Sequence, residues 1–317
     1  MRITQNNDVL NDIIDTLGLR GALYFRTDFS PPWAISVPDY ERAARFHLVV
    51  QGRCFLQTPS ETVVELKAGD FIMIPAGRAH AISSDPAEKA AALEDVIEKS
   101  GFNGHGVFKL GSHDPSASVQ LVCGHFTFAA NADHPLLRAL PEYLLVTNAL
   151  RAQNPWLDEV LRLIVRQIFA DPENSSATVT RLSEVIFIES LRACADQSDA
   201  LQRFLGALRE KRIGNALLLM HNRLDEPWTL ERIASEVGMS RSKFAETFRE
   251  RVGCSPMTYL SEWRIQKAVN MLTSSRLSVQ QVAARTGYQS AAAFTRAFSQ
   301  KTGASPKNFR RQHGATA

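Results

Sequence analysis

Five side chains in the N-terminal part of the chain could bind a metal or respond to an oxidant: His47, Cys54, His80, Cys123 and His125. Imidazole nitrogens and thiolates are the ligands that zinc and similar metals prefer, so His47, His80 and His125 are candidate ligands of a divalent metal. Cys123 and His125 stand two residues apart, and on a strand this spacing places both side chains on one face. A cation beside Cys123 would make its thiolate more reactive, and Cys54, on another predicted strand, could pair with it.

Two other interpretations of these residues remain open. Histidines in a wall of strands often serve as hydrogen-bonding partners, and buried cysteines are often inert. An organic effector would need neither cysteine, because it requires only a cavity with a few placed polar groups. Four cysteines in 317 residues do not make a disulfide framework, so we expect reduced thiols and a cytoplasmic protein.

The segment that carries these residues has the pattern of β-structure. Short runs rich in β-branched and aromatic residues recur from about residue 20 to 128, separated by turns such as the one at Gly52. Residues 86–104 are rich in alanine and charge, and we predict that they form an insertion or a mobile connection outside the core.

From Pro135 onward the hydrophobic period changes to that of helices. Residues 155–169 carry an apolar stripe at helical spacing that is too hydrophobic to stay exposed. We therefore predict a helical connector, residues 141–208, whose helices pack on each other, on the β-domain or on a second subunit of a homodimer.

Two stretches near the C-terminus repeat one pattern. Each has a helix-capping residue, a glycine suited to positive φ, a second cap, and two phenylalanines four residues apart. This is the pattern of a helix-turn-helix, and it occurs twice. The residues are Thr229, Gly238, Ser240, Phe244 and Phe248 in the first copy, and Ser278 with Gln281, Gly287, Phe294 and Phe298 in the second.

A single helix is predicted between the two copies. The stretch after Ser255 and Pro256 lacks glycine and internal proline, and its apolar residues recur at helical spacing up to Leu272. A rigid linking helix would fix the distance between two recognition helices, so that one subunit reads two successive major-groove segments.

The charge of the chain is distributed unevenly. The net charge is +3, but residues 211–317 carry +10 and residues 1–210 carry −7. After Glu262 there is no acidic residue at all. From charge alone, this end is either a solvated basic surface or the site of a polyanion. Together with the helix-turn-helix pattern, the charge favours double-stranded DNA as the partner of that end.

Outward positions on the two recognition helices are the candidate DNA-binding residues. A carboxylate such as Glu246 near DNA is tolerated best where it accepts from cytosine, or else it is an ordinary solvated side chain. Ala291 and Ala292 can touch thymine methyls, and Arg296 could contact guanine or phosphate. The full set is Arg241, Ser242, Ala245, Glu246, Arg249, Gln289, Ser290, Ala291, Ala292, Thr295 and Arg296.

The C-terminal third resembles the DNA-binding domain of the AraC family of bacterial transcription regulators. The family's signature, which runs from a glycine-aromatic pair to a final aromatic-arginine pair, is matched over its whole length. The matching residues are Gly287, Tyr288, Ser290, Phe294, Arg296, Phe298, Gly303, Ser305, Pro306, Phe309 and Arg310. This resemblance implies a DNA-binding regulator, with RNA polymerase as a further partner.

The N-terminal part resembles a cupin barrel of the kind that serves as ligand domain in one AraC subgroup. The second conserved cupin motif is matched by Gly69, Pro75, Gly77 and His80, with Ser84 where asparagine is usual. The first motif is poorly matched, because Val49 stands where a second metal-ligating histidine would follow His47, and no glutamate stands at ligand spacing.

We therefore predict an α+β protein with an N-terminal cupin-like β-barrel at residues 7–140, the helical connector, and a C-terminal all-α double helix-turn-helix domain at residues 209–313. The predicted function is a transcription regulator that catalyses no reaction and whose cupin-like domain senses a small molecule or an oxidant.

Two alternatives are a metal-dependent cupin enzyme fused to a DNA-binding tail and a redox switch through Cys54 and Cys123. We expect no signal peptide and no membrane partner. The sequence leaves open the effector, the operator and whether transcription is activated or repressed.

Overall fold

The computed structural model describes residues 6–40, 43–104, 106–111, 116–129, 132–170 and 177–313, and these form two compact units. The β-unit comprises Arg20–Thr127 and Leu140–Ser198. The helical unit comprises Met1–Leu19, Phe128–Ala139 and Asp199–Ala317. The division differs from the predicted boundaries, because residues 6–19 and 132–139 pack with the helix-turn-helix repeat, and the predicted connector is cut at Ser198.

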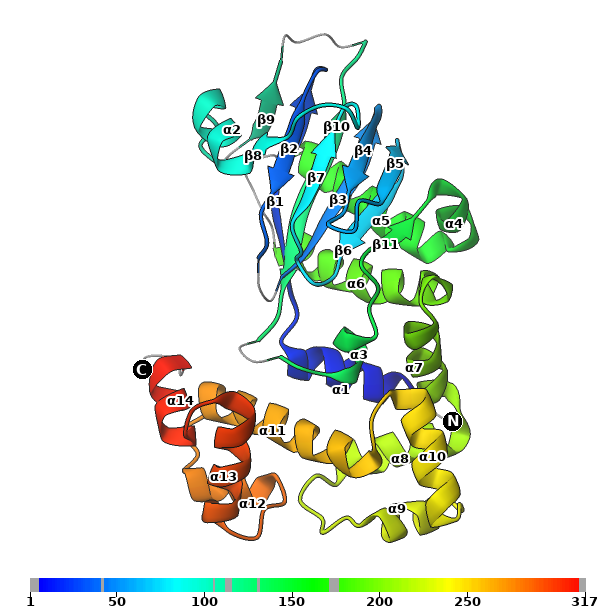
Figure 1. Cartoon of the computed structure of the whole chain (residues 1–317), viewed down its shortest axis with the longest axis vertical. Coiled ribbons are helices and arrows are strands. Elements are labelled where there is room, and N and C mark those ends of the chain that lie inside the picture. The colour runs from blue at the N-terminus through cyan, green and yellow to red at the C-terminus, as the bar shows by residue number, and fades with distance from the viewer. Residues whose placement is uncertain are drawn as a thin grey trace. The chain divides into compact units, whose positions relative to one another are not determined.

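The strands of the β-unit form two sheets (Figure 1). The six-stranded sheet has the order β11-β6-β3-β10-β1-β9, and the five-stranded sheet has the order β5-β4-β7-β2-β8. Most neighbours are antiparallel, with parallel pairs β1–β9 and β2–β8. The strands are β1 (Arg20–Phe29), β2 (Ala34–Val37), β3 (Ala43–Gln51), β4 (Arg53–Gln57), β5 (Val63–Lys67), β6 (Phe71–Ile74), β7 (His80–Ser83), β8 (Ala91–Ala92), β9 (Val107–Leu110), β10 (Gln120–Thr127) and β11 (Leu144–Val146).

The two sheets share one hydrophobic core. Buried and exposed residues alternate along β4 and β5, as expected for strands with one face toward the core. By contrast, β3 is buried on both faces from Ala43 to Val49. The reason is a second layer of helices on the outer face of the six-stranded sheet.

Helices α5 (Pro155–Ala170) and α6 (Ala177–Ala193) form that second layer. The ring centroids of Phe126 on β10 and Phe187 on α6 lie 5.2 Å apart. At Gly21 of β1 a Cβ atom would lie 2.5 Å from the Cβ of Ser183, so only glycine permits this approach. The remaining helices of the β-unit are α2 (Leu93–Ser100), α4 (Asn148–Gln153) and the 3-10 helix η1 (Ala195–Gln197).

The helical unit is built around the predicted linking helix. That helix, α11 (Pro256–Ser274), begins at the Ser255 cap and continues without interruption. The other helices are α1 (Asn6–Leu17), α3 (Pro135–Arg138), α7 (Asp199–Arg209), α8 (Lys211–Asn222), α9 (Leu230–Glu236), α10 (Arg241–Val252), α12 (Val279–Arg285), α13 (Ala291–Thr302) and α14 (Pro306–His313). The predicted α+β class is confirmed. In the described ranges no helix is long and apolar enough to cross a bilayer.

Candidate nucleic-acid interface and ligand cavity

The first helix-turn-helix consists of α9 and α10, and its turn has the predicted caps. The side chain of Thr229 accepts from the amide of Arg232, and that of Ser240 accepts from the amide of Lys243. Gly238 adopts φ of 66°, a conformation that side chains rarely take. These local contacts fix where α9 ends and α10 begins, and so they set the direction of the first recognition helix.

The outward face of α10 carries the predicted DNA-binding residues. Phe244 and Phe248 are fully buried on the inner face. The outer face exposes Arg241, Ser242, Glu246 and Arg249, and Ala245 is half-buried. Two of these residues form surface ion pairs, Arg241 with Glu231 at 2.9 Å and Glu246 with Lys243 at 3.0 Å. Exposed pairs contribute little free energy, so DNA could displace them at low cost.

The second helix-turn-helix, α12 and α13, repeats this construction. Ser278 and Gln281 form the predicted capping box, and Gly287 adopts φ of 79°. The side chain of Ser290 accepts from the amide of Ala293 and starts α13. On the outward face Gln289, Ser290, Ala292 and Arg296 are exposed, and Ala291 and Thr295 are half-buried.

Three of the candidate sensor residues form one hydrogen-bonded chain inside the β-unit. His47 on β3 and Cys123 on β10 are direct partners in the antiparallel register. The Cys123 Sγ lies 3.2 Å from Nδ1 of His47, and Nε2 of His47 lies 2.9 Å from Nε2 of His80. Nδ1 of His80 lies 3.0 Å from the carbonyl oxygen of Arg78.

That carbonyl fixes the direction of every proton in the chain, because an oxygen of this kind can only accept. His80 donates from Nδ1 to Arg78, so its Nε2 accepts from His47. The Nδ1 of neutral His47 then accepts from the thiol of Cys123. Burial holds the pKa of His47 well below its usual value and lowers that of His80 to about 4, so both imidazoles are neutral at pH 7.

The two core cysteines are held as thiols. Burial, with a further contribution from Asp70, raises the pKa of Cys54 to about 12. Burial and the neighbouring Cys54 also raise the pKa of Cys123. Both side chains belong to the core between the sheets. Because the thiolate is the form that reacts with oxidants, neither residue has the environment of a reactive cysteine.

The metal that a cupin-like fold implies does not fit these residues. Cys123 lies on one side of the His47 ring and His80 on the other, so the three cannot converge on one ion. His125 is half-buried and pairs in register with Arg45 rather than with His47. Within the described ranges, no group of three or more potential ligands could hold a metal ion.

A cavity of about 240 Å³ lies between the sheets, beside His47 and Cys123. His80, Cys54 and His125 are not among the residues that line it. Its wall is mainly aromatic and aliphatic, as in sites for small organic molecules. The lining residues are Phe25, Phe29, Ile35, Val37, Tyr40, Arg45, His47, Ile82, Leu93, Ile97, Phe108, Leu121, Cys123 and Gly124.

Helix α2 closes part of this cavity, in the segment that was predicted to lie outside the core. Leu93 and Ile97, one helical turn apart, line the cavity, and Val96 also packs against the core. The prediction of an insertion was wrong for this helix. In this segment rich in alanine and charge, Leu93, Val96 and Ile97 stand three and four residues apart. This apolar spacing is the sequence signal that predicts a helix with one buried face.

Arg45 is the second feature that the sequence did not point to. Arg45 is only 5% exposed and lines the apolar cavity. Its guanidinium carbon lies 3.9 Å from the centroid of the Tyr40 ring. A buried cation is costly unless it is paired or stacked. The cavity therefore combines an apolar wall, two neutral histidines in or beside it, and one permanent positive charge.

The sequence matches two family models. Residues 8–196 match a model described as Cupin, and residues 233–312 match a model described as a helix-turn-helix domain. The first match covers the β-unit and the second covers both recognition helices.

Two relatives match this chain over nearly their whole length. The transcriptional regulator AlkR of Acinetobacter baylyi is 30% identical over 310 residues, which cover 96% of this chain and 99% of that protein. An AraC-like transcription regulator of Streptomyces antibioticus is 28% identical over 316 residues, 96% of this chain and 98% of that protein. Among solved structures, the C-terminal domain of the response regulator AraT from Geobacillus stearothermophilus is 25% identical, with a TM-score of 0.33, and covers 34% of this chain and 89% of that chain.

Proposed function

The chain belongs to the AraC family of helix-turn-helix transcription regulators, and from this premise we propose that its β-unit is the sensor for a small organic effector. The observation that carries the proposal is the cavity of about 240 Å³ between the sheets, with Arg45 as its buried cation. The effector is a mainly apolar molecule with one anionic or hydrogen-bond-accepting group, which Arg45 would contact.

Two other functions are less well supported. An oxidant sensor would need a stabilised thiolate, but burial raises the pKa of both Cys54 and Cys123. A cupin enzyme would need open ligand positions for a metal, whereas the ring nitrogens of His47 already have partners. Relatives over the whole chain are named as transcriptional regulators. We therefore propose that the β-unit binds its effector without converting it.

The effector proposal is tested by ligand-induced stabilisation of the full chain. Short aliphatic and aromatic carboxylates are compared with the uncharged alcohols of the same carbon skeletons, and the shift in Tm is measured for each. The carboxylates should stabilise the wild type, and Arg45→Met should lose that shift while it keeps any response to the alcohols. The matched control is Arg53→Met, which removes a guanidinium whose side chain is 72% exposed on β4.

A wild type that responds equally to acids and alcohols would exclude a role for Arg45 in recognition. A wild type that responds to neither series would exclude this class of effector.

We also propose that the chain forms a homodimer through α5. Trp156 and Leu163 remain 64% and 39% exposed, although the other side of α5 is buried in the β-unit. Glu159 and Arg166 lie on the same face as these two residues, because positions three, seven and ten residues apart share one side of a helix. All four lie within the described part of α5.

The charge order on this face selects the orientation of the second copy. Glu159 lies toward the start of α5, and Arg162 and Arg166 lie toward its end. A parallel copy would place like charges together, but an antiparallel copy places each acidic end against a basic end. A groove of about 610 Å³, lined in part by Glu159, Arg162 and Arg166, adjoins the face and could receive the partner's tryptophan.

The dimer is tested by the mass of the full chain in solution, measured by light scattering. Trp156→Glu should convert a dimer into a monomer. Val63→Glu is the matched control, because it also replaces an exposed apolar side chain, one that is 46% exposed on β5. A wild-type monomer, or a Trp156→Glu dimer of unchanged affinity, would exclude α5 as the interface.

The proposed readers of DNA are the outward residues of α10 and α13 named above. RNA polymerase is the expected partner of the bound regulator, as in the family. We propose that the protein acts in the cytoplasm, where the DNA of a bacterium lies.

A further inference from the structure

Residues 132–139 follow β10 in the sequence and pack within the helical unit. Pro135, Arg138 and Ala139 line a cavity of about 240 Å³ together with Glu250–Gly253, at the end of α10. Ala132 and Asp133 line a second cavity of about 180 Å³ together with Lys301 and Thr302, at the end of α13. One short segment therefore faces the C-terminal ends of both helices that are proposed to read DNA, in each case across a cavity.

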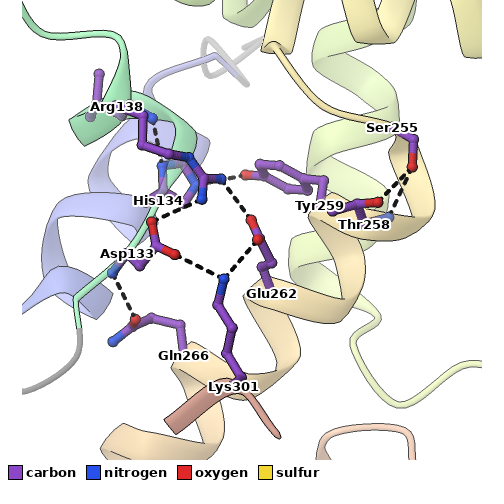
Figure 2. Close-up of polar contacts among 10 residues, drawn as sticks. Asp133, His134, Arg138, Ser255, Thr258, Tyr259, Glu262, Gln266 and Lys301 are labelled. Carbon is purple, nitrogen blue, oxygen red and sulfur yellow. Dashed lines mark hydrogen bonds and ion pairs between the residues drawn. The ribbon is translucent and has the colours of Figure 1, made fainter. Parts of the chain in front are cut away.

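A closed ring of four charges fixes the segment to α11 and α13 (Figure 2). Asp133 contacts Arg138 at 2.9 Å, Arg138 contacts Glu262 of α11 at 2.7 Å, and Glu262 contacts Lys301 of α13 at 2.8 Å. Lys301 completes the ring with Asp133 at 2.8 Å. Each charge thus touches two of opposite sign, and a network of this kind holds its geometry better than an isolated pair.

The carboxylate of Glu262, which joins Arg138 to Lys301 in the ring, is held in its charged form. Burial alone would raise the pKa of Glu262, but hydrogen bonds from Arg138 and Lys301 outweigh it and leave the pKa below its usual value. The backbone amide of Asp133 also donates to Oε1 of Gln266, one turn further along α11, at 3.4 Å. The ring therefore persists at neutral pH and fixes the segment at two levels of α11.

A second, buried chain of hydrogen bonds fixes the segment to the start of α11. The amide of Leu136 donates to Nδ1 of His134, so the neutral imidazole donates from Nε2 to the hydroxyl of Tyr259, 3.1 Å away. The Tyr259 hydroxyl donates in turn to Nε2 of His221, at 2.7 Å. His221 then donates from Nδ1 to Asp12 of α1, at 2.8 Å.

We propose that residues 132–139 act as a brace that sets the separation and mutual rotation of α10 and α13, with Asp133 and Lys301 as positioning residues. The linking helix α11 joins the two helix-turn-helix copies along the chain. The brace adds a second connection, because the charge ring holds it to α13 and the chain from His134 through Tyr259 to His221 holds it to α8, which precedes the first copy. Two connections resist a hinge motion that one connection allows. The brace therefore determines how strictly the protein discriminates the spacing of two DNA segments.

The spacing of DNA provides the test, because one extra base pair moves a groove segment along the axis and rotates it by roughly 35°. The wild-type chain selects its consensus from a random-sequence DNA library at fixed salt. Derivatives of that consensus then gain or lose one base pair between the two read segments. The Kd of each derivative relative to the consensus gives a spacing penalty, for which about tenfold is expected with the wild type.

Two variants that change the net charge in opposite directions separate the effect of the brace from the effect of charge. Lys301→Met removes a positive charge and should weaken binding to every DNA, whereas Asp133→Asn removes a negative charge and should strengthen it. Both should nevertheless reduce the spacing penalty, to about threefold or less, because both open the ring. Lys301→Arg keeps the charge and should keep the penalty. Arg53→Met, which breaks the surface pair with Glu65 in the β-unit, is the control.

The proposal is overturned if both variants keep the wild-type spacing penalty, because α11 alone would then set the distance. It is also overturned if the wild type shows no penalty or a consensus with only one read segment. If a variant changes the Kd by the same factor at every spacing, the change reflects only its altered charge. This result would also contradict a brace. Thermal unfolding of each variant verifies that it is folded, as expected for residues at the rim of the unit.

Discussion

Cys123 donates its thiol proton to His47, its direct neighbour across the β10–β3 pair, with Sγ 3.2 Å from Nδ1. Sequence spacing associates Cys123 with His125 instead, because the two lie on one strand. The observed partner, His47, lies 76 positions away in the sequence, and its unprotonated Nδ1 accepts the hydrogen bond from the thiol. This relationship makes Cys123 a part of the cavity wall beside His47 rather than a reactive thiolate.

Slow reaction of the core thiols is the first prediction. With a disulfide reagent at pH 8, Cys54, Cys123 and the buried Cys194 should react only after unfolding, because burial raises the pKa of each. Cys254 is only partly buried and should react first. The thiolate released from the reagent is measured over time with and without denaturant. Cys254→Ser should remove the early phase of this release. Rapid labelling of Cys123 in the folded protein would restore the redox interpretation.

Acid should destabilise the β-unit through His80. Its pKa in the folded state is about 4, because burial outweighs the hydrogen bond to Arg78, whereas the pKa of an unfolded histidine is about 6.5. Below pH 6.5 the unfolded chain binds a proton at His80 that the folded chain does not bind. The contribution of neutral His80 to the free energy of unfolding is therefore complete above pH 6.5 and is lost as the pH falls toward 4.

Urea unfolding at several pH values measures this effect. His80→Gln should reduce the slope by up to about 1.4 kcal/mol per pH unit below pH 6.5. The control is His313→Gln, which replaces an exposed histidine on α14. Equal slopes for wild type and His80→Gln would show that His80 is already protonated in the fold or does not control the transition.

Tyr259→Phe should destabilise the helical unit by about 1–3 kcal/mol, because it leaves buried nitrogens of His134 and His221 without their partner. The ring itself, 1% exposed, would keep its packing. Tyr288→Phe is the matched control, since that tyrosine is half-buried and the loss of its hydrogen bond with Ser261 should cost only about 0.5–1.5 kcal/mol. Chemical denaturation of both variants decides the matter. Equal losses would mean that the buried chain contributes no more than an ordinary hydroxyl.

Base readout by α10 should depend on Glu246. Glu246→Ala should relax the preference at one cytosine-containing position by about 1–3 kcal/mol, while Arg249→Ala should weaken binding to all sequences alike. Selection of DNA by each variant at the same salt concentration distinguishes these effects. An unchanged consensus for Glu246→Ala would mean that its pair with Lys243 is an ordinary surface contact.

The sequence by itself determined the double helix-turn-helix. Caps at Thr229, Ser240 and Ser278, the glycine at residue 238 and the paired phenylalanines act on residues within one or two turns of themselves. Such signals are local, so they can be read without knowing what else packs nearby. The alternation of the strands and the stripe of α5 were readable for the same reason.

Tertiary structure alone decided the cavity and the brace. His47 is paired with Cys123 by strand register, and α2 closes the cavity from a segment whose composition indicated an insertion. His134 meets Tyr259 across 125 positions of sequence. Contacts of this kind depend on which surfaces meet after the chain has folded, and no periodicity within one segment encodes its distant partner. The sequence therefore determined the two helix-turn-helix elements, and the packing decided what the β-unit can hold and which segment holds α11 and α13 together.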